Sequence, residues 1–389
     1  MLESAFLIFI LFQNIISKFL PNIFSYWDEL LCLFLIVFFL IKTNGKIMIV
    51  DFQCFITLGI LIVIGILGNI FWGYQLKVSA IIRDIIGAIK FPVVFICLYR
   101  LNITNKLAKK MIKLVPYIKK ICLVILLFGI LNIFFDLGMR QEEIRGFIHP
   151  YMFLYTHPTY LTTGMISILC ILNAANEVKV RDDVVILSII ALAMRTKGLA
   201  FIAVYIFTKY GIHWVKKLKI LYWPSIAIIV FLVVRRKFLL YASFSNSPRE
   251  SLYVGAFSLM KQCFPIGSGF ASFASHLSGK FFSQVYNIIH IAGLYDVTGQ
   301  ISVDIGDAGI PYYLGQFGVL GTLFFCFLFY KILKMSFMNL KAEDRKVVCY
   351  VWLLIAISIP TEAILVNNGV ELAFVLVIVY KLCKYKEVN

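Results

Sequence analysis

Residues 52–72 read FQCFITLGILIVIGILGNIFW, an apolar run without a charged side chain. A helix that crosses the hydrocarbon core of a bilayer needs about 20 such residues. The rest of the chain has the same character, because 61% of its 389 residues are hydrophobic and only 15% are charged. A soluble domain is usually about a quarter charged. The composition therefore predicts an all-α integral membrane protein and argues against a soluble, disordered or collagenous chain.

The apolar runs predict a polytopic protein with about twelve transmembrane helices. A single membrane domain is expected over residues 1–389, and its first span is expected to be retained because no basic leader or small-residue cleavage site precedes it. One long periplasmic or extracellular loop is predicted over residues 235–309, between the ninth and tenth spans. The expected spans are 5–24, 26–41, 52–72, 78–99, 118–136, 153–175, 183–195, 198–212, 218–234, 310–332, 347–361 and 369–383.

The distribution of basic residues predicts the orientation of these spans. The chain has 37 Lys plus Arg against 20 Asp plus Glu, a formal net charge of +17. Most of these cations fall in alternate short loops, as in the segment 100–120, and cytoplasmic loops are the ones enriched in Lys and Arg. Both termini are therefore predicted to be cytoplasmic. Membrane topology explains the basic excess, so nucleic acid is not an expected partner.

The cysteines and glycines give no sign of a cofactor. Of the nine cysteines only Cys263 falls in a long polar segment, and no CxxC or Cys/His spacing indicates a metal site. We expect them to pack as small apolar side chains. The absence of a GxxxxGK[ST] phosphate loop argues against an ATP-driven pump. The sequence predicts neither a metal nor a cofactor.

Two short apolar segments, 183–195 and 198–212, flank the turn Arg195-Thr196-Lys197-Gly198. Each segment is too short to cross the hydrocarbon core fully, so we expect the turn to lie below the outer surface. Two cations at that depth are costly unless they face a polar cavity or an anionic ligand. Backbone N–H groups at the start of the following helix also favour an anion. The alternative is a pair of cations that snorkel from a helix end.

Arg83, Gly87 and Lys90 are spaced to share one face of the fourth span. Cations on one face of an intramembrane helix suggest a water-filled cleft that opens to the outside. Asp84 offers a different explanation, because it is close enough in sequence to neutralise one of them in a buried structural ion pair.

Other candidate residues lie in the outer loops. Arg145, in the stretch RGFIHP, is a candidate ligand for a phosphate or sugar, or an ordinary solvated arginine. His290 is a titratable candidate in the long loop. Asp307 precedes a helix expected to begin at Ile310, where a carboxylate either accepts a proton from a sugar hydroxyl or caps the helix.

Several of these motifs together resemble a known family. They are RTKG between the two short spans, SPRESLYVGAF and FPIGSGF in the long loop, and DAGIPYYLGQFGVLG at the entry to the tenth span. Over roughly residues 140–330 the chain resembles the bacterial O-antigen and capsule polymerases of the Wzy type and their relatives, the O-antigen ligases. Ligases carry a His where this chain has Asp307, eleven positions before Gly318, and this departure favours a polymerase.

The resemblance implies a GT-C-like glycosyltransferase in the bacterial cytoplasmic (inner) membrane. Such an enzyme moves a glycan from undecaprenyl diphosphate to the next lipid-linked repeat unit at the outer face. Its partners are the lipid-linked donor and acceptor, membrane lipids and a chain-length regulator protein, and no metal or cofactor is implied. The implied diphosphate and glycan ligands are Arg249 and Arg195 with Lys197, Arg145, Arg83 and Lys90, and Asp307 or His290 is the implied base.

Three other functions remain open from the sequence. A ligase would transfer the glycan to lipid A core, whereas a sensory or scaffolding protein would catalyse no reaction. A flippase or other transporter would have paired, inverted broken helices around a pathway that reaches both membrane faces. A polymerase is instead expected to have one outward cavity covered by the loop 235–309.

Overall fold

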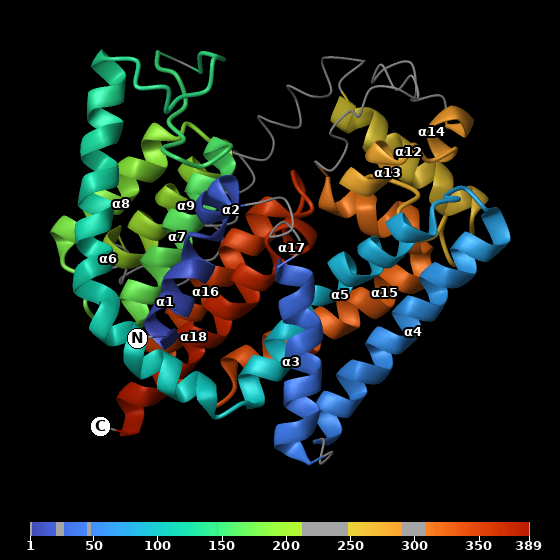
Figure 1. Ribbon diagram of the computed structural model, residues 1–389, viewed down its shortest axis with the longest axis horizontal. Coiled ribbons are helices and arrows are strands. Elements are labelled where there is room, and N and C mark those ends of the chain that lie inside the picture. The colour runs from blue at the N-terminus through green and yellow to red at the C-terminus, as the bar shows by residue number, and fades with distance from the viewer. Residues whose placement is uncertain are drawn as a thin grey trace.

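The computed structural model describes residues 2–20, 27–44, 48–145, 147–211, 248–289 and 308–388, and within these ranges the chain is all-α and has no β-strand (Figure 1). The helices are α1 (Leu2–Leu11), α2 (Gln13–Phe19), α3 (Trp27–Thr43), α4 (Ile49–Trp72), α5 (Val78–Arg100), α6 (Ile103–Phe134), α7 (Pro158–Ala174), α8 (Val180–Leu192), α9 (Thr196–Ile206), the π-helix η2 (Phe207–Gly211), α12 (Pro248–Gln262), α13 (His276–Lys280), α14 (Val285–Ile288), α15 (Gly309–Phe337), α16 (Ala342–Ser358), α17 (Ile364–Asn367) and α18 (Gly369–Val388).

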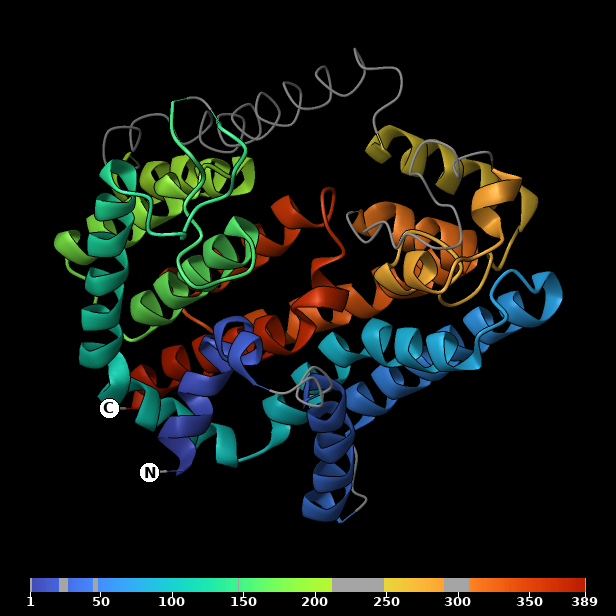
Figure 2. The same cartoon turned by 45° about the horizontal axis from the view of Figure 1, so that its top comes forward.

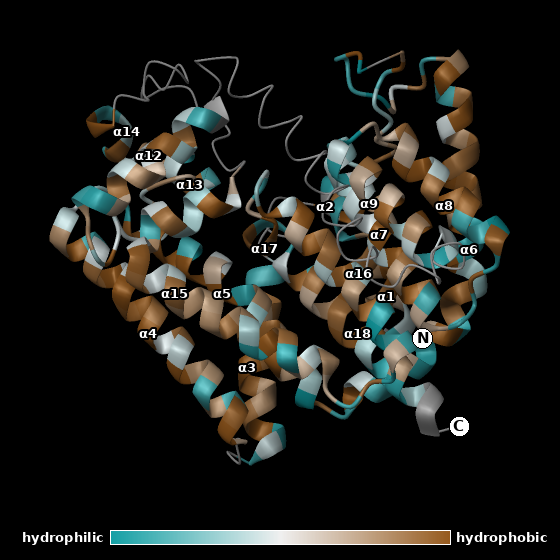
Figure 3. Ribbon diagram, turned by 180° about the vertical axis from the view of Figure 1, so that it is seen from behind, coloured by the Kyte–Doolittle hydropathy of each residue, from teal (hydrophilic) through white to brown (hydrophobic). Residues whose placement is uncertain are grey.

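Three of the described helices, α4, α6 and α15, are long and apolar enough to cross a membrane. Their outer faces carry large exposed apolar side chains, such as Ile70 and Phe71 on α4 and Phe134 on α6. Figure 3 shows that α4, α15 and the second half of α6 are predominantly apolar. An exposed apolar surface of this extent indicates contact with lipid rather than water. The fold is therefore that expected of a multi-pass membrane protein.

The described helices overlap eleven of the twelve predicted spans, and the remaining one, 218–234, lies outside the described residues. Three of the helices differ most from the prediction. Helix α6 begins at Ile103 rather than near 118, because its basic first half still buries an apolar stripe that includes Leu107 and Met111. The first predicted span is divided at Phe12 into α1 and α2.

Helix α7 begins at Pro158 instead of 153. Pro158 occupies the first helical turn, where its missing N–H is not needed. The ring of His157 accepts a hydrogen bond from the backbone N–H of Thr159 at 3.3 Å and so caps the helix. The His-Pro pair therefore fixes where α7 starts.

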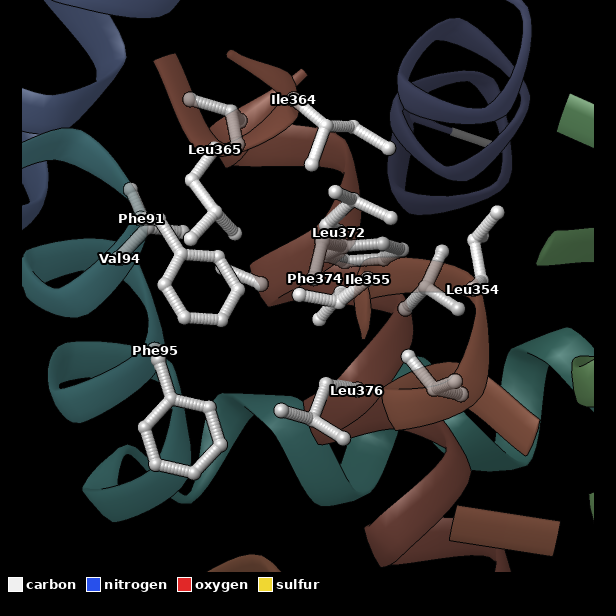
Figure 4. Close-up of a cluster of buried hydrophobic side chains, with 14 of the residues drawn as sticks. Phe91, Val94, Phe95, Leu354, Ile355, Ile364, Leu365, Leu372, Phe374 and Leu376 are labelled. Atoms are coloured by element: carbon white, nitrogen blue, oxygen red, sulfur yellow. The ribbon is translucent and has the colours of Figure 1, made fainter. Parts of the chain in front are cut away.

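Helix α18 is the centre of the apolar core. Its side chains from Leu372 to Val379 are fully buried, so the helix is enclosed on every side. Figure 4 shows Leu372, Phe374 and Leu376 facing apolar side chains of α5 and α16, among them Phe91 and Ile355. A helix that is hydrophobic all round is expected in such a position. In Figures 1 and 2 the start of α1 and the end of α18 lie side by side.

The loop after α12 is locked to a break in α15. Gly318 has φ +59° and ψ −161° inside α15, and Gly267 has φ +78° in the loop. A Cβ built on Gly267 would lie 2.3 Å from the backbone nitrogen of Gly318, and one built on Gly318 would lie 2.5 Å from that of Gly267. The two backbones therefore approach each other as closely as only glycine permits. Two of the motifs noted in the sequence, FPIGSGF and DAGIPYYLGQFGVLG, meet at this point.

Polar side chains from three helices hold the same loop. Asn69 of α4 forms two hydrogen bonds with the backbone of Phe270, at 2.8 and 2.9 Å. The backbone N–H of Ala271 donates to the carboxylate of Asp84 of α5 at 2.7 Å and to the side chain of Gln316 of α15 at 3.1 Å. A loop buried between spans needs such partners for its backbone groups. This segment of the long loop is thus a built part of the fold.

Alanine at Gly318 or Gly267 is expected to destabilise the protein by more than about 3 kcal/mol, because backbone strain and close packing both oppose a Cβ there. Gly73 is the matched control, since it also has a positive φ, +61°, but no atom lies within 4 Å of its built Cβ. Gly73→Ala should cost only about 1 kcal/mol. Thermal unfolding in detergent, followed by size-exclusion chromatography, measures the difference, and equal losses in all three variants would contradict the interlock.

Candidate functional site

The turn between α8 and α9 places Arg195 at the N-cap position of α9. Its Nη2 atom donates to Oε1 of Gln141 at 2.8 Å and lies 2.6 Å from Nε2 of His157. Gln141 belongs to the connection between α6 and α7, and His157 caps α7. Residues near the two ends of the α6–α7 connection therefore orient the guanidinium, as expected where a cation must be held in a fixed position.

Lys197 lies in the first turn of α9 and is buried, with 7% of its side chain exposed. Its Nζ atom donates to Oγ1 of Thr163 at 2.9 Å and forms an ion pair with Oε1 of Glu362 at 2.7 Å. A Cβ on the next residue, Gly198, would meet side chains of α7 and α8 at 3.0 and 2.8 Å. The close packing that glycine permits directs Lys197 toward Glu362, so Lys197 does not snorkel to the surface.

The segment 359–363, which connects α16 to α17, joins three regions of the chain. Its Glu362 holds Lys197 of α9. The carbonyl oxygen of Pro360 accepts a hydrogen bond from the hydroxyl of Tyr253 of α12 at 2.8 Å. The carbonyl oxygen of Ile359 accepts one from the backbone N–H of Gly309, the first residue of α15, at 3.1 Å. Three of the four sequence motifs, RTKG, SPRESLYVGAF and DAGIPYYLGQFGVLG, therefore converge on this connection.

The candidate residues of the long loop are only partly described. Arg249 is in the first turn of α12, one turn before Tyr253, so its helix starts next to the connection 359–363. Asp307 and His290 lie outside the described residues. The helix after Asp307 begins at Gly309, with Ala308 at the N-cap position and no side-chain cap.

Arg145 is close to the Arg195 region rather than isolated. Its guanidinium forms an ion pair with Glu143 at 2.9 Å. The hydrogen bond from Arg145 lowers the pKa of the Glu143 carboxyl below its usual range, and the positive charges of Arg145 and Arg195 lower it further. Glu143 is thus within electrostatic reach of Arg195. The loop brings Arg145 and Arg195 to the same end of the bundle.

The water-filled cleft expected along the α5 face of Arg83, Gly87 and Lys90 is closed over part of that face. Gly87 packs against Val366 of α17 at 3.1 Å from its built Cβ, and the side chain of Lys90 packs against Gly369 at the same distance. Lys90 is buried and forms an ion pair with Asp28 of α3. Helix α17 and the start of α18 therefore occupy the space next to Gly87 and Lys90 where water was expected. Arg83 lies one turn before Gly87 in α5 and is half-buried. Asp84 is bound to Ala271 of the long loop, as described above.

Sequence reasoning missed Glu362 and Glu371. Glu362 directly follows the apolar segment 347–361, and Glu371 is a charged residue within the span 369–383, with 1% exposure. An acidic residue in or beside a span is itself a functional signal. Gln141, Thr163 and the role of His157 had no comparable signal, because their partners are distant in sequence. Among the described residues, no group of three His, Cys, Asp or Glu side chains is placed to hold a metal ion.

No family model, curated protein or solved structure matches the chain.

We expect Lys197→Met to lower the free energy of unfolding by about 3 kcal/mol, because it leaves the mostly buried carboxylate of Glu362 without its cation. Thermal unfolding in detergent measures the loss, and Lys120→Met is the control, because Lys120 is exposed near the middle of α6, beside the start of α8 and away from the turn that carries Lys197. Adding Glu362→Gln should recover much of the loss. Strictly additive losses in the double variant would contradict a direct Lys197–Glu362 interaction.

Proposed function

We propose that the protein is a glycosyltransferase that polymerises undecaprenyl-diphosphate-linked oligosaccharide repeat units into O-antigen or capsular polysaccharide. One observation carries the proposal: the Arg195–Lys197 turn, the start of α12 with Arg249 and the start of α15 meet at the connection 359–363. These are the motifs that resemble the polymerases, and they lie far apart in the sequence. Their convergence is what an active site built from them requires.

The chemistry of the site fits a lipid diphosphate as the leaving group. Negative charge develops on the diphosphate when its bond to the sugar breaks, and fixed cations stabilise that charge. Arginine binds phosphate oxygens in a bidentate manner, and Gln141 and His157 already orient Arg195. Arg195 also heads an 11-residue helix, whose free N–H groups favour an anion. In this proposal Arg249 and Arg195 bind the donor diphosphate. Arg145 and Arg83 support them from the outer end of the bundle.

The reaction is proposed to take place at the outer face of the bacterial cytoplasmic membrane, with both termini in the cytoplasm and about twelve spans in a GT-C-like arrangement. Helix α8 supports a site below the membrane surface. It has 13 residues and rises only about 20 Å, against a hydrocarbon core of about 30 Å. A recessed site is accessible to a substrate whose lipid tail remains in the bilayer. The neighbouring chain-length regulator would act on the product from the same side.

Deletion of the gene tests the reaction. We expect the surface polysaccharide of the mutant to retain single-repeat material and to lose the ladder of longer chains in electrophoresis, because export continues while extension stops. Complementation with the wild-type gene should restore the ladder. Persistence of long chains would exclude a polymerase, complete loss of single-repeat material from the surface would favour a flippase, and long chains without attachment to lipid A core would favour a ligase.

Arginine substitutions test the site. Arg195→Ala should reduce chain extension tenfold to a hundredfold, since a hydrogen bond to a charged group contributes about 1.5 to 3 kcal/mol. Arg249→Ala and Arg249→Lys should both reduce it, because lysine cannot reproduce the bidentate contact. Arg181→Ala is the matched control, since Arg181 is an exposed arginine at the opposite end of α8 from Arg195. Full extension by Arg195→Ala in membranes with a normal amount of folded protein would remove Arg195 from the mechanism.

A further inference from the structure

We propose that Glu362 is a catalytic residue, the carboxylate that accepts the proton of the acceptor hydroxyl, and that Lys197 is its gate. This inference rests on the proposed function and deepens it. In the structure Lys197 engages one oxygen of the carboxylate, Oε1, at 2.7 Å. A carboxylate accepts several hydrogen bonds, so Oε2 is available to a second donor.

The position of Glu362 distinguishes it from other carboxylates of the described chain. Asp84 and Glu371 are both 1% exposed, and Asp84 is already bound to the backbone of the long loop. Glu143 lies in an exposed loop and is held by Arg145. Glu362 is 16% exposed and directly contacts the cationic turn of α9. It therefore combines limited access from outside with contact to the groups assigned to the diphosphate.

The backbone around Glu362 is held firmly enough for a catalytic role. The N–H of Glu362 donates to the carbonyl oxygen of Ser358 at 2.9 Å, and its own carbonyl oxygen would lie 2.8 Å from a Cβ on Gly309. The hydroxyl of Tyr253 holds the carbonyl of Pro360 two residues earlier. Catalytic groups need such support, because a small displacement from the productive geometry costs much of the rate.

The ion pair gives the site an ordered sequence of events. Before substrate arrives, Lys197 neutralises Glu362, which stabilises both charges away from bulk water. A donor diphosphate carries more negative charge than a single carboxylate, so it competes for Lys197. When Lys197 turns to the diphosphate, Glu362 loses its cation and becomes a better proton acceptor. Binding of the donor thereby activates the base.

The bond changes are those of a glycosyl transfer. The acceptor hydroxyl oxygen forms a bond to the anomeric carbon of the donor sugar, and the bond from that carbon to the diphosphate oxygen breaks. The bonding electrons leave with the undecaprenyl diphosphate, whose charge Arg195 and Lys197 stabilise. The hydroxyl proton passes to Glu362 and is later released to water. The products are the extended glycan and undecaprenyl diphosphate.

The test uses membranes of the deletion strain, which hold its own lipid-linked single repeats, with each variant supplied from a plasmid. The rate of chain extension per folded protein is followed by electrophoresis. Glu362→Gln should extend chains at least about a hundredfold more slowly, since general base catalysis contributes at least this factor. Asp28→Asn is the matched control: its ion pair with Lys90 has side-chain exposures of 6% and 16%, against 7% and 16% for Lys197 and Glu362. It should show a comparable loss of stability with extension near the wild-type rate.

Two further variants separate a base from a structural counter-ion. The charge exchange Lys197→Glu with Glu362→Lys should restore thermal stability without restoring extension. Added formate should partly rescue Glu362→Ala, by supplying a carboxylate in the vacated space, and should not rescue Arg195→Ala. Wild-type extension by Glu362→Gln, or by the charge-exchanged variant, would overturn the inference alone. Failure of the wild-type chain to produce long glycans would overturn the proposed function and the inference with it.

Discussion

The ion pair between Lys197 and Glu362 is the interaction on which the arrangement of the candidate site depends. A charge buried inside the protein is tolerated only with a partner, so Lys197 and Glu362 must meet wherever α9 and the connection 359–363 are placed. Because the same connection also accepts hydrogen bonds from Tyr253 and Gly309, fixing it fixes the starts of α12 and α15. One electrostatic requirement thus organises three regions of the chain.

The second constraint is steric, and it acts at the other end of α12. The approach of Gly267 to Gly318 joins the loop after α12 to α15, while Asn69 holds the same loop to α4. Helix α12 is therefore fastened at its start through Tyr253 and beyond its end through Gly267. A helix held at both ends cannot swing freely, so the position of Arg249 in its first turn follows from contacts made by other residues.

The sequence predicted the helices well and their partners poorly, for a physical reason. Apolar length identifies a span such as α4 without knowledge of its neighbours, whereas the basic half of α6 and the break at Phe12 depend on what the helix packs against. The same holds for the site. Arg195 and Lys197 were identified because charged residues between short apolar runs are unusual. Glu362 was missed, because its partner, Lys197, lies 165 positions away in the sequence. Asp307 and His290, the predicted bases, lie outside the described residues.

Burial alone does not separate a structural ion pair from a functional one in this protein. Lys90 with Asp28 and Lys197 with Glu362 have nearly the same exposures. The surroundings differ. Asp28 lies in the first turn of α3 and Lys90 in the middle of α5, where its side chain packs against the start of α18, so their pair ties these helices together. Glu362 lies in a connection that meets the ends of three other elements, and its cation heads a short helix next to Arg195. At such a junction Lys197 can leave Glu362 for an anionic ligand. The pair of Lys90 with Asp28 holds helices together and has no anionic ligand to compete for its lysine.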